Sequence, residues 1–188
     1  MTSHTPLRVV NRALVVTAAL PIVVSSADAQ PAAVGPHVYR PGIDVVDYAI
    51  TLGLPDRGAA IDGRAVLAVR RSARVDTLVL DLVSLRVDSV FIDGRATLFA
   101  RTDSTIRIPI GGVVADSFSV AIRYGGEPKD GLIIRTDSLG RWTGFGDNWP
   151  NRARNWIPSV DHPSDKATVT WTVVAPSDRR VVANGELV

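Results

Sequence analysis

DNWPNRARNWIPSVDHPSDKA, residues Asp147 to Ala167, is the stretch where aromatic, proline and charged residues crowd together. Its three X-Pro steps bias the preceding residues away from helix and predict an extended, turning backbone. We expect the apolar area of Trp149 and Trp156 to be buried, whereas the charged side chains must find partners or water. Two interpretations are open, a structural corner of a β domain or the wall of a binding site, and the mixed charges favour the corner.

Length and composition predict an ordinary globular protein. The 188 residues suit one domain, with 46% hydrophobic and 21% charged residues. The net charge is only +2, and the basic residues are spread among aspartates, so nucleic acid is not an expected partner. The chain has no cysteine, which excludes a disulfide framework and a thiolate metal site.

The first 29 residues have the pattern of a secretory signal peptide. Arg8 and Arg12 precede an apolar run over 13–24, and the small-residue site Ala27-Asp28-Ala29 follows. A membrane span needs about 20 apolar residues, so we expect cleavage after Ala29, no stable membrane insertion, and an exported chain in the periplasm or outside the cell. An uncleaved N-terminal anchor is the alternative.

Residues 30–42 contain three prolines and predict a flexible lead-in to a folded domain over 43–188. Alternating and β-branched runs separated by turn signals, with no sustained helical period, predict an all-β sandwich or open barrel. Pro109 suggests an edge position or a strand end. The expected strands are 44–52, 60–70, 78–85, 87–91, 106–110, 117–124, 131–135, 141–145 and 168–174, with another beginning at 180–182. Because Asn184-Gly185 is a hairpin signal with little chain after it, the domain is expected to be incomplete at its C-terminal end.

No catalytic or metal-ligating residue is predicted. The histidines are His4, His37 and His162, and the chain has no HExxH, nucleophile-elbow or phosphate-loop motif. His162 is better explained as a hydrogen-bonded corner residue than as a ligand. Asp161 and Asp165 could do acid-base chemistry, but Lys166 and Arg152 or Arg154 lie close in sequence, which favours a charge-balanced structural network.

WPNRARNWIPSVDHPSDKATVTWTVVAP, followed by VVANGEL, resembles the end of the N-terminal β domain of the aminopeptidase N-like (gluzincin) zinc metallopeptidases. The resemblance extends over residues 43–188. It implies a saddle-like β-sandwich of mixed, mainly antiparallel strands that covers one side of a zinc-binding catalytic domain. The motif residues in register or within it are Pro150, Ala153, Arg154, Trp156, Pro158, Asp161, Pro163, Lys166, Ala167, Pro176, Asn184 and Gly185.

The departures from this family limit what the resemblance implies. In the family a following catalytic domain supplies the exopeptidase loop and the HExxH helix and holds the zinc. Neither sequence motif is present here. Zinc is therefore expected only in a catalytic metallopeptidase domain, missing or separate, which would be the partner. By the family's register Asp147 is the residue that could bind the substrate's amine, whereas Trp149 stands where the family has a glutamate and cannot pair with an ammonium.

These observations predict an exported, non-catalytic N-terminal domain, present as a fragment of an aminopeptidase N-like zinc metallopeptidase and inactive alone. A stand-alone secreted β-sandwich that binds or assembles with a partner is the alternative. An enzyme in its own right is disfavoured by the residue types.

Overall fold

The structure is a computed structural model that describes residues 40–187. The predicted signal peptide and all but the last three residues of the predicted lead-in lie outside the described residues. The elements are β1 (Ile43–Gly53), β2 (Ile61–Arg71), β3 (Thr77–Asp81), β4 (Arg86–Ile92), β5 (Arg95–Thr97), β6 (Ala100–Arg101), β7 (Thr105–Pro109), β8 (Ser117–Gly126), β9 (Leu132–Thr136), β10 (Trp142–Gly146), the 3-10 turn η1 (Ala153–Asn155) and β11 (Thr168–Val174). The expected all-β class is confirmed.

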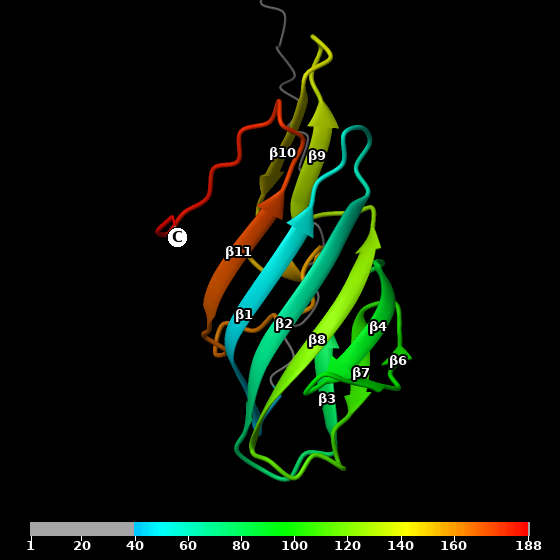
Figure 1. Ribbon diagram of the computed structural model, residues 1–188, viewed down its shortest axis with the longest axis vertical. Helices are drawn as coiled ribbons and strands as arrows, with labels where there is room; N and C mark the ends of the chain where they lie inside the picture. The colour runs from blue at the N-terminus through cyan, green and yellow to red at the C-terminus, as the bar shows by residue number, and fades with distance from the viewer. Residues whose placement is uncertain (1–39, 188) are drawn as a thin grey trace, which may run out of the picture. The chain divides into compact units, whose positions relative to one another are not determined.

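The strands form three sheets, of which the largest has the order β11-β1-β2-β8-β4-β5 (Figure 1). Its pairs are antiparallel except β1 with β11, which run parallel from Asp47 beside Thr168 to Gly53 beside Val174. A second sheet has the order β3-β7-β6, and β9 and β10 make a separate hairpin. Mixed, mainly antiparallel pairing is thus confirmed, and β11 lies at one edge of the large sheet.

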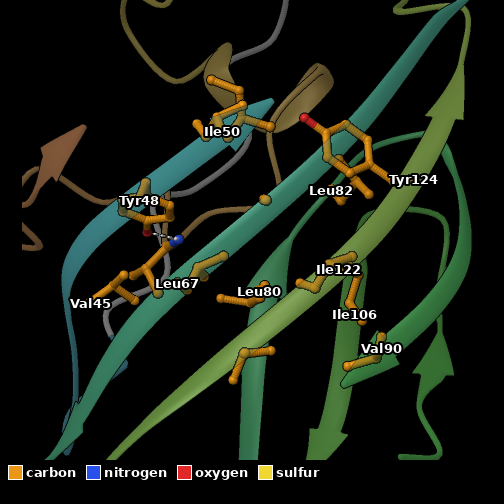
Figure 2. Packing of buried hydrophobic residues seen from close by; sticks show 14 of the residues in the cluster. Val45, Tyr48, Ile50, Leu67, Leu80, Leu82, Val90, Ile106, Ile122 and Tyr124 are labelled. Carbon is orange, nitrogen blue, oxygen red and sulfur yellow. Dashed lines mark hydrogen bonds between the residues drawn. The ribbon is translucent and has the colours of Figure 1, made fainter. Parts of the chain in front are cut away.

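The core lies between the large sheet and the three-stranded sheet (Figure 2). The alternating run of β8 buries Phe118, Val120, Ile122 and Tyr124 on one face, as its pattern predicts. These side chains meet buried residues of β3 and β7. Gly63 is needed opposite Tyr124, because a Cβ atom there would lie 2.2 Å from the ring. The packing therefore requires both the alternation and this glycine.

The strand expected at 78–85 ends at Asp81. The backbone N–H of Asp81 donates to the carbonyl of Ser159 at 2.7 Å, and Ser159 returns a bond of 3.1 Å, so the chain leaves the sheet to meet the segment around Ser159. Ser84 then has φ 60°, which no regular strand contains. A local pattern of apolar residues could not foresee this bridge to a distant segment.

The strand expected to begin at 180–182 is not formed, so that prediction is wrong. Arg179 is held instead, with its guanidinium donating to the carbonyls of Trp142 and Asp56 at 3.2 Å each. Pro109 is the last residue of β7, the middle strand of its sheet, so the strand-end interpretation is confirmed and the edge interpretation is wrong. No helix in the described part of the chain has the length and hydropathy that crossing a membrane requires.

Candidate functional site

The predicted site segment, residues Asp147 to Ala167, begins with ion pairs that hold it against the residues just before β9. Arg152 Nη1 lies 2.9 Å from Asp147 Oδ2, and Arg152 Nε lies 3.4 Å from Asp130 Oδ2. The backbone N–H of Asp147 donates to the carbonyl of Gly131 at 2.6 Å. Gly131 has φ +74°, and a Cβ atom there would lie 2.2 Å from the Arg152 carbonyl oxygen. A glycine is required at position 131, because the backbone of Gly131 and the backbone of Arg152 approach too closely for any side chain.

A chain of alternating charges fixes the middle of the segment. Arg154 Nε donates to Asp161 Oδ2 at 2.8 Å, and the two side chains are only 15% and 13% exposed. The N–H of Asp161 donates to Asp81 Oδ2 at 3.1 Å. Asp81 also accepts two bonds from Arg40, at 2.8 and 2.6 Å. The network therefore joins the beginning of the described chain, the end of β3 and the predicted site segment.

The predicted pair Asp161 and Asp165 does not form a carboxylate dyad. Asp161 bonds to Arg154, whereas Asp165 Oδ1 accepts from the backbone N–H of Val45 at 3.2 Å, and the nearby Tyr48 hydroxyl is buried. The Tyr48 hydroxyl accepts from the N–H of Val160 at 3.1 Å. Burial raises the pKa of Asp165 above its ordinary value, although the Val45 bond opposes the shift, and burial also raises the pKa of Tyr48. The arrangement holds loops in place and presents no acid-base pair to solvent.

Aromatic side chains line an open groove of about 960 Å³ between this segment, β1, β11, the β9–β10 hairpin and the C-terminal stretch. Trp156 is buried and stacks on Trp171 of β11, with ring centroids 5.3 Å apart and planes 14° apart. Its indole N–H donates to Asn148 Oδ1 at 2.9 Å. Pro150 and Pro163 also line the groove, and Pro158 is buried. Two prolines of the motif and Trp156 thus form part of its wall.

Two expectations about this segment are wrong. Trp149 is 81% exposed, because its neighbours Asn148 and Asp147 make the inward contacts to Trp156 and Arg152. Lys166 is exposed and forms no ion pair with any residue of 40–187, and the neighbouring Asp165 accepts from the backbone N–H of Val45 instead. The charge-balanced network exists, but without Lys166.

Asp81 and Arg40 belong to the site network but were not predicted from the sequence. Asp81 is the one charged residue in the run LVLDLVSL, and a charge in so apolar a run implies a buried partner. The partner's identity has no local signal, since Arg40 is 41 residues away. His162 bonds to Ser164, with Nδ1 and Oγ 2.7 Å apart. In the described range no group of three His, Cys, Asp or Glu side chains is arranged to hold a metal ion.

The sequence matches the family model of the peptidase M1 N-terminal domain over residues 45–188. Among curated proteins it is similar to a leucyl aminopeptidase of Saccharolobus solfataricus, with 28% identity over 120 residues, which are 58% of this chain and 14% of that protein. The relative is thus far longer than the matched part.

Solved structures of the same family have the same fold. The M1 zinc metallopeptidase of Deinococcus radiodurans superposes with a TM-score of 0.62 and 26% identity, over 73% of this chain and 33% of that one. Yeast LTA4 hydrolase gives a TM-score of 0.65 and 25% identity, over 72% and 23% of the two chains. The present chain thus spans a third or less of the length of these relatives.

Proposed function

This chain belongs to the family of peptidase M1 N-terminal domains, and we propose from that premise that it is an exported, non-catalytic domain covering one side of a zinc peptidase's active site. Its sheets would form the saddle-like sandwich expected of the family. The catalytic domain, on the same or another polypeptide, would be its partner and would hold the zinc. Export rests on the signal-peptide pattern of residues 1–29.

The observation that carries the proposal is the exposure of two aromatic side chains, Trp149 on the segment with the family motif and Phe145 of β10 just before it. Trp149 is 81% exposed and Phe145 is 46% exposed, and both flank Asp147 in sequence. Tryptophan and phenylalanine are enriched at protein interfaces and uncommon on open surfaces. A domain that worked alone would be expected to cover them, so the surface favours a partner over the stand-alone module.

Asp147 is the residue we propose to face the substrate. Its side chain is 42% exposed although Arg152 lies 2.9 Å away, so one carboxylate can keep that ion pair and still meet an ammonium group. Arg152 is itself held by Asp130 at 3.4 Å. The two aspartates and the arginine would thus place a negative charge where the amine of a peptide's first residue could bind.

Hydrolysis is assigned to the partner because this sequence has no HExxH, and its three histidines are too scattered to form a ligand set. The domain's proposed contribution is to wall the site and position the amine. Zinc, when bound in the catalytic domain, would polarise the peptide carbonyl and activate water.

The test is to titrate the purified chain into the catalytic part of an M1 zinc metallopeptidase, such as the Deinococcus radiodurans enzyme without its own N-terminal domain. We expect binding by calorimetry, weakened about tenfold or more by Trp149→Ser, the size of an interface hot spot. The control is Leu139→Ser, since Leu139 is 74% exposed on the β9–β10 turn. Absence of binding, or equal effects of the two variants, would contradict the proposal. Export is tested separately by N-terminal sequencing of the exported chain, which should begin at Gln30.

A further inference from the structure

The face of the large sheet that points away from the core carries two arginines side by side. Arg64 of β2 and Arg123 of β8 are directly opposite each other in the antiparallel register, and these strands lie in the middle of the sheet (Figure 1). Both side chains are exposed, whereas the adjacent Ala65 and Ile122 are buried. Opposite residues on paired strands have Cβ atoms about 5 Å apart, and like charges at such positions destabilise a sheet. The fold thus holds two positive charges together although they repel each other.

No carboxylate balances these two arginines in the described part of the chain. Neither of them forms an ion pair or a hydrogen bond within 40–187. The acids on the same face lie beside Arg86 instead. Arg86 Nη2 donates to Asp88 Oδ2 at 3.3 Å, and a Cβ atom on Gly125 would lie 3.5 Å from that Nη2 and 3.3 Å from Asp62 Oδ1. The charge of the arginine pair is therefore left for a ligand to balance.

Hydroxyl side chains continue the row on both sides of the arginine pair. Thr51 of β1 is opposite Arg64, and Ser89 of β4 is opposite Arg123. Thr172 of β11 follows opposite Thr51. Hydroxyls and guanidiniums both donate hydrogen bonds, and a guanidinium donates two in parallel to a phosphate. The row therefore presents donors on neighbouring strands and contains no carboxylate.

This row lies on the side of the sheet that faces away from the groove. Ile50 and Leu52 of β1 line the groove, and Thr51 between them points to the other side. Arg64 and Arg123 are in the same row as Thr51. The catalytic partner of the proposed function would lie against the motif segment, so a ligand on this row is independent of that partner.

We propose that Arg64 and Arg123 bind one phosphate group between their guanidiniums, with Thr51 and Ser89 donating to its remaining oxygens. A phosphate monoester carries about −1.5 to −2 charges at pH 7, which matches two guanidiniums, whereas a carboxylate carries a single charge. Arginine is the side chain best suited to planar, bidentate recognition of phosphate. A bound phosphate also removes the repulsion between β2 and β8.

The experiment is a titration of the purified full chain with inorganic phosphate at constant ionic strength, followed by the melting temperature. We expect a saturable rise, because a ligand that binds only the folded state stabilises it. Arg64→Gln and Arg123→Gln should each weaken the apparent affinity about tenfold or more, as expected for losing charged hydrogen bonds. Acetate at the same concentrations should bind more weakly.

The matched control is Arg107→Gln. Arg107 is an exposed arginine of β7 whose strand neighbours are Val79 and Ala100, so it has no second arginine opposite it. This variant should respond to phosphate as the wild type does, which also accounts for general stabilisation by phosphate exclusion from protein surfaces. The absence of a saturable response, or equal responses of Arg107→Gln and Arg64→Gln, would overturn the proposal.

The variants without phosphate give a second measurement. Arg64→Gln and Arg123→Gln should melt at or above the wild-type temperature, because each removes a like-charge contact. Lower melting temperatures in both would show that the pair stabilises the fold without a ligand, which would contradict the proposal.

Two further titrations distinguish the sources of the phosphate group. Glycerol phosphate represents a soluble ester, and vesicles of phosphatidylcholine with or without phosphatidic acid represent a lipid headgroup. Vesicle binding that requires both phosphatidic acid and the two arginines assigns the site to a headgroup, and binding of glycerol phosphate alone assigns it to a soluble ester. Binding of either probe that persists in the double variant Arg64→Gln/Arg123→Gln would contradict the assigned residues.

Discussion

Replacing Asp81 by alanine tests whether the buried charge network holds the site segment in place. The change removes the acceptor of both Arg40 bonds and of the Asp161 N–H, which lie at 2.6 to 3.1 Å. The Arg40 side chain is only 14% exposed, so its guanidinium would be left almost out of reach of water. Removing one member of a buried pair costs about 3–5 kcal/mol, because the other charge stays unpaired.

For a domain of this size, a loss of about 4 kcal/mol lowers the melting temperature by roughly 8–16 °C. Urea unfolding followed by tryptophan fluorescence is a suitable assay, because Trp156 and Trp171 stack within the affected region. The matched control is Asp88→Ala, which removes a surface partner of Arg86 and should change stability little. If Asp81→Ala destabilises the protein no more than Asp88→Ala, the network does not hold the fold and the reasoning is refuted.

Gly131→Ala should destabilise the domain by about 1–3 kcal/mol more than Gly140→Ala in the same assay, because both glycines have positive φ but only Gly131 meets a carbonyl at 2.2 Å. Equal losses would contradict the close approach. Asp165→Asn should flatten the pH dependence of stability. The folded pKa of Asp165 lies above its unfolded value, so the native state binds more protons and wild-type stability falls as pH rises through that interval. Unchanged curves for the variant would contradict the burial of this carboxyl.

Much of the sheet could be predicted from sequence because its strands are long and alternating. The period of two in 117–124 identified both β8 and its buried face, and the β-branched run at 168–174 identified β11. The strand predictions that were wrong concern places where the chain makes contacts with residues far away in the sequence. Asp81 ends β3 by bridging to Ser159, and Arg179 binds the Trp142 and Asp56 carbonyls where a strand was expected.

The site was predicted in outline, since one segment carries most of its members. A charge network around Asp161 with Arg152 or Arg154 was predicted because these residues lie close in sequence, and the structure pairs Asp161 with Arg154. The burial of Trp156 was predicted from its apolar area. The exposure of Trp149 could not be read from composition, because it depends on which neighbours turn inward. The role of Arg40 was equally hidden, since the pairing of charges far apart in sequence is set by the fold.

The most direct test of the central claim is to assay the purified chain alone for release of amino acids from a leucyl peptide, with zinc supplied. We predict no release above background, because the proposed function assigns hydrolysis to a zinc-binding catalytic domain. Zinc-dependent release that follows this chain through purification, with contaminating peptidases excluded, would contradict the assignment.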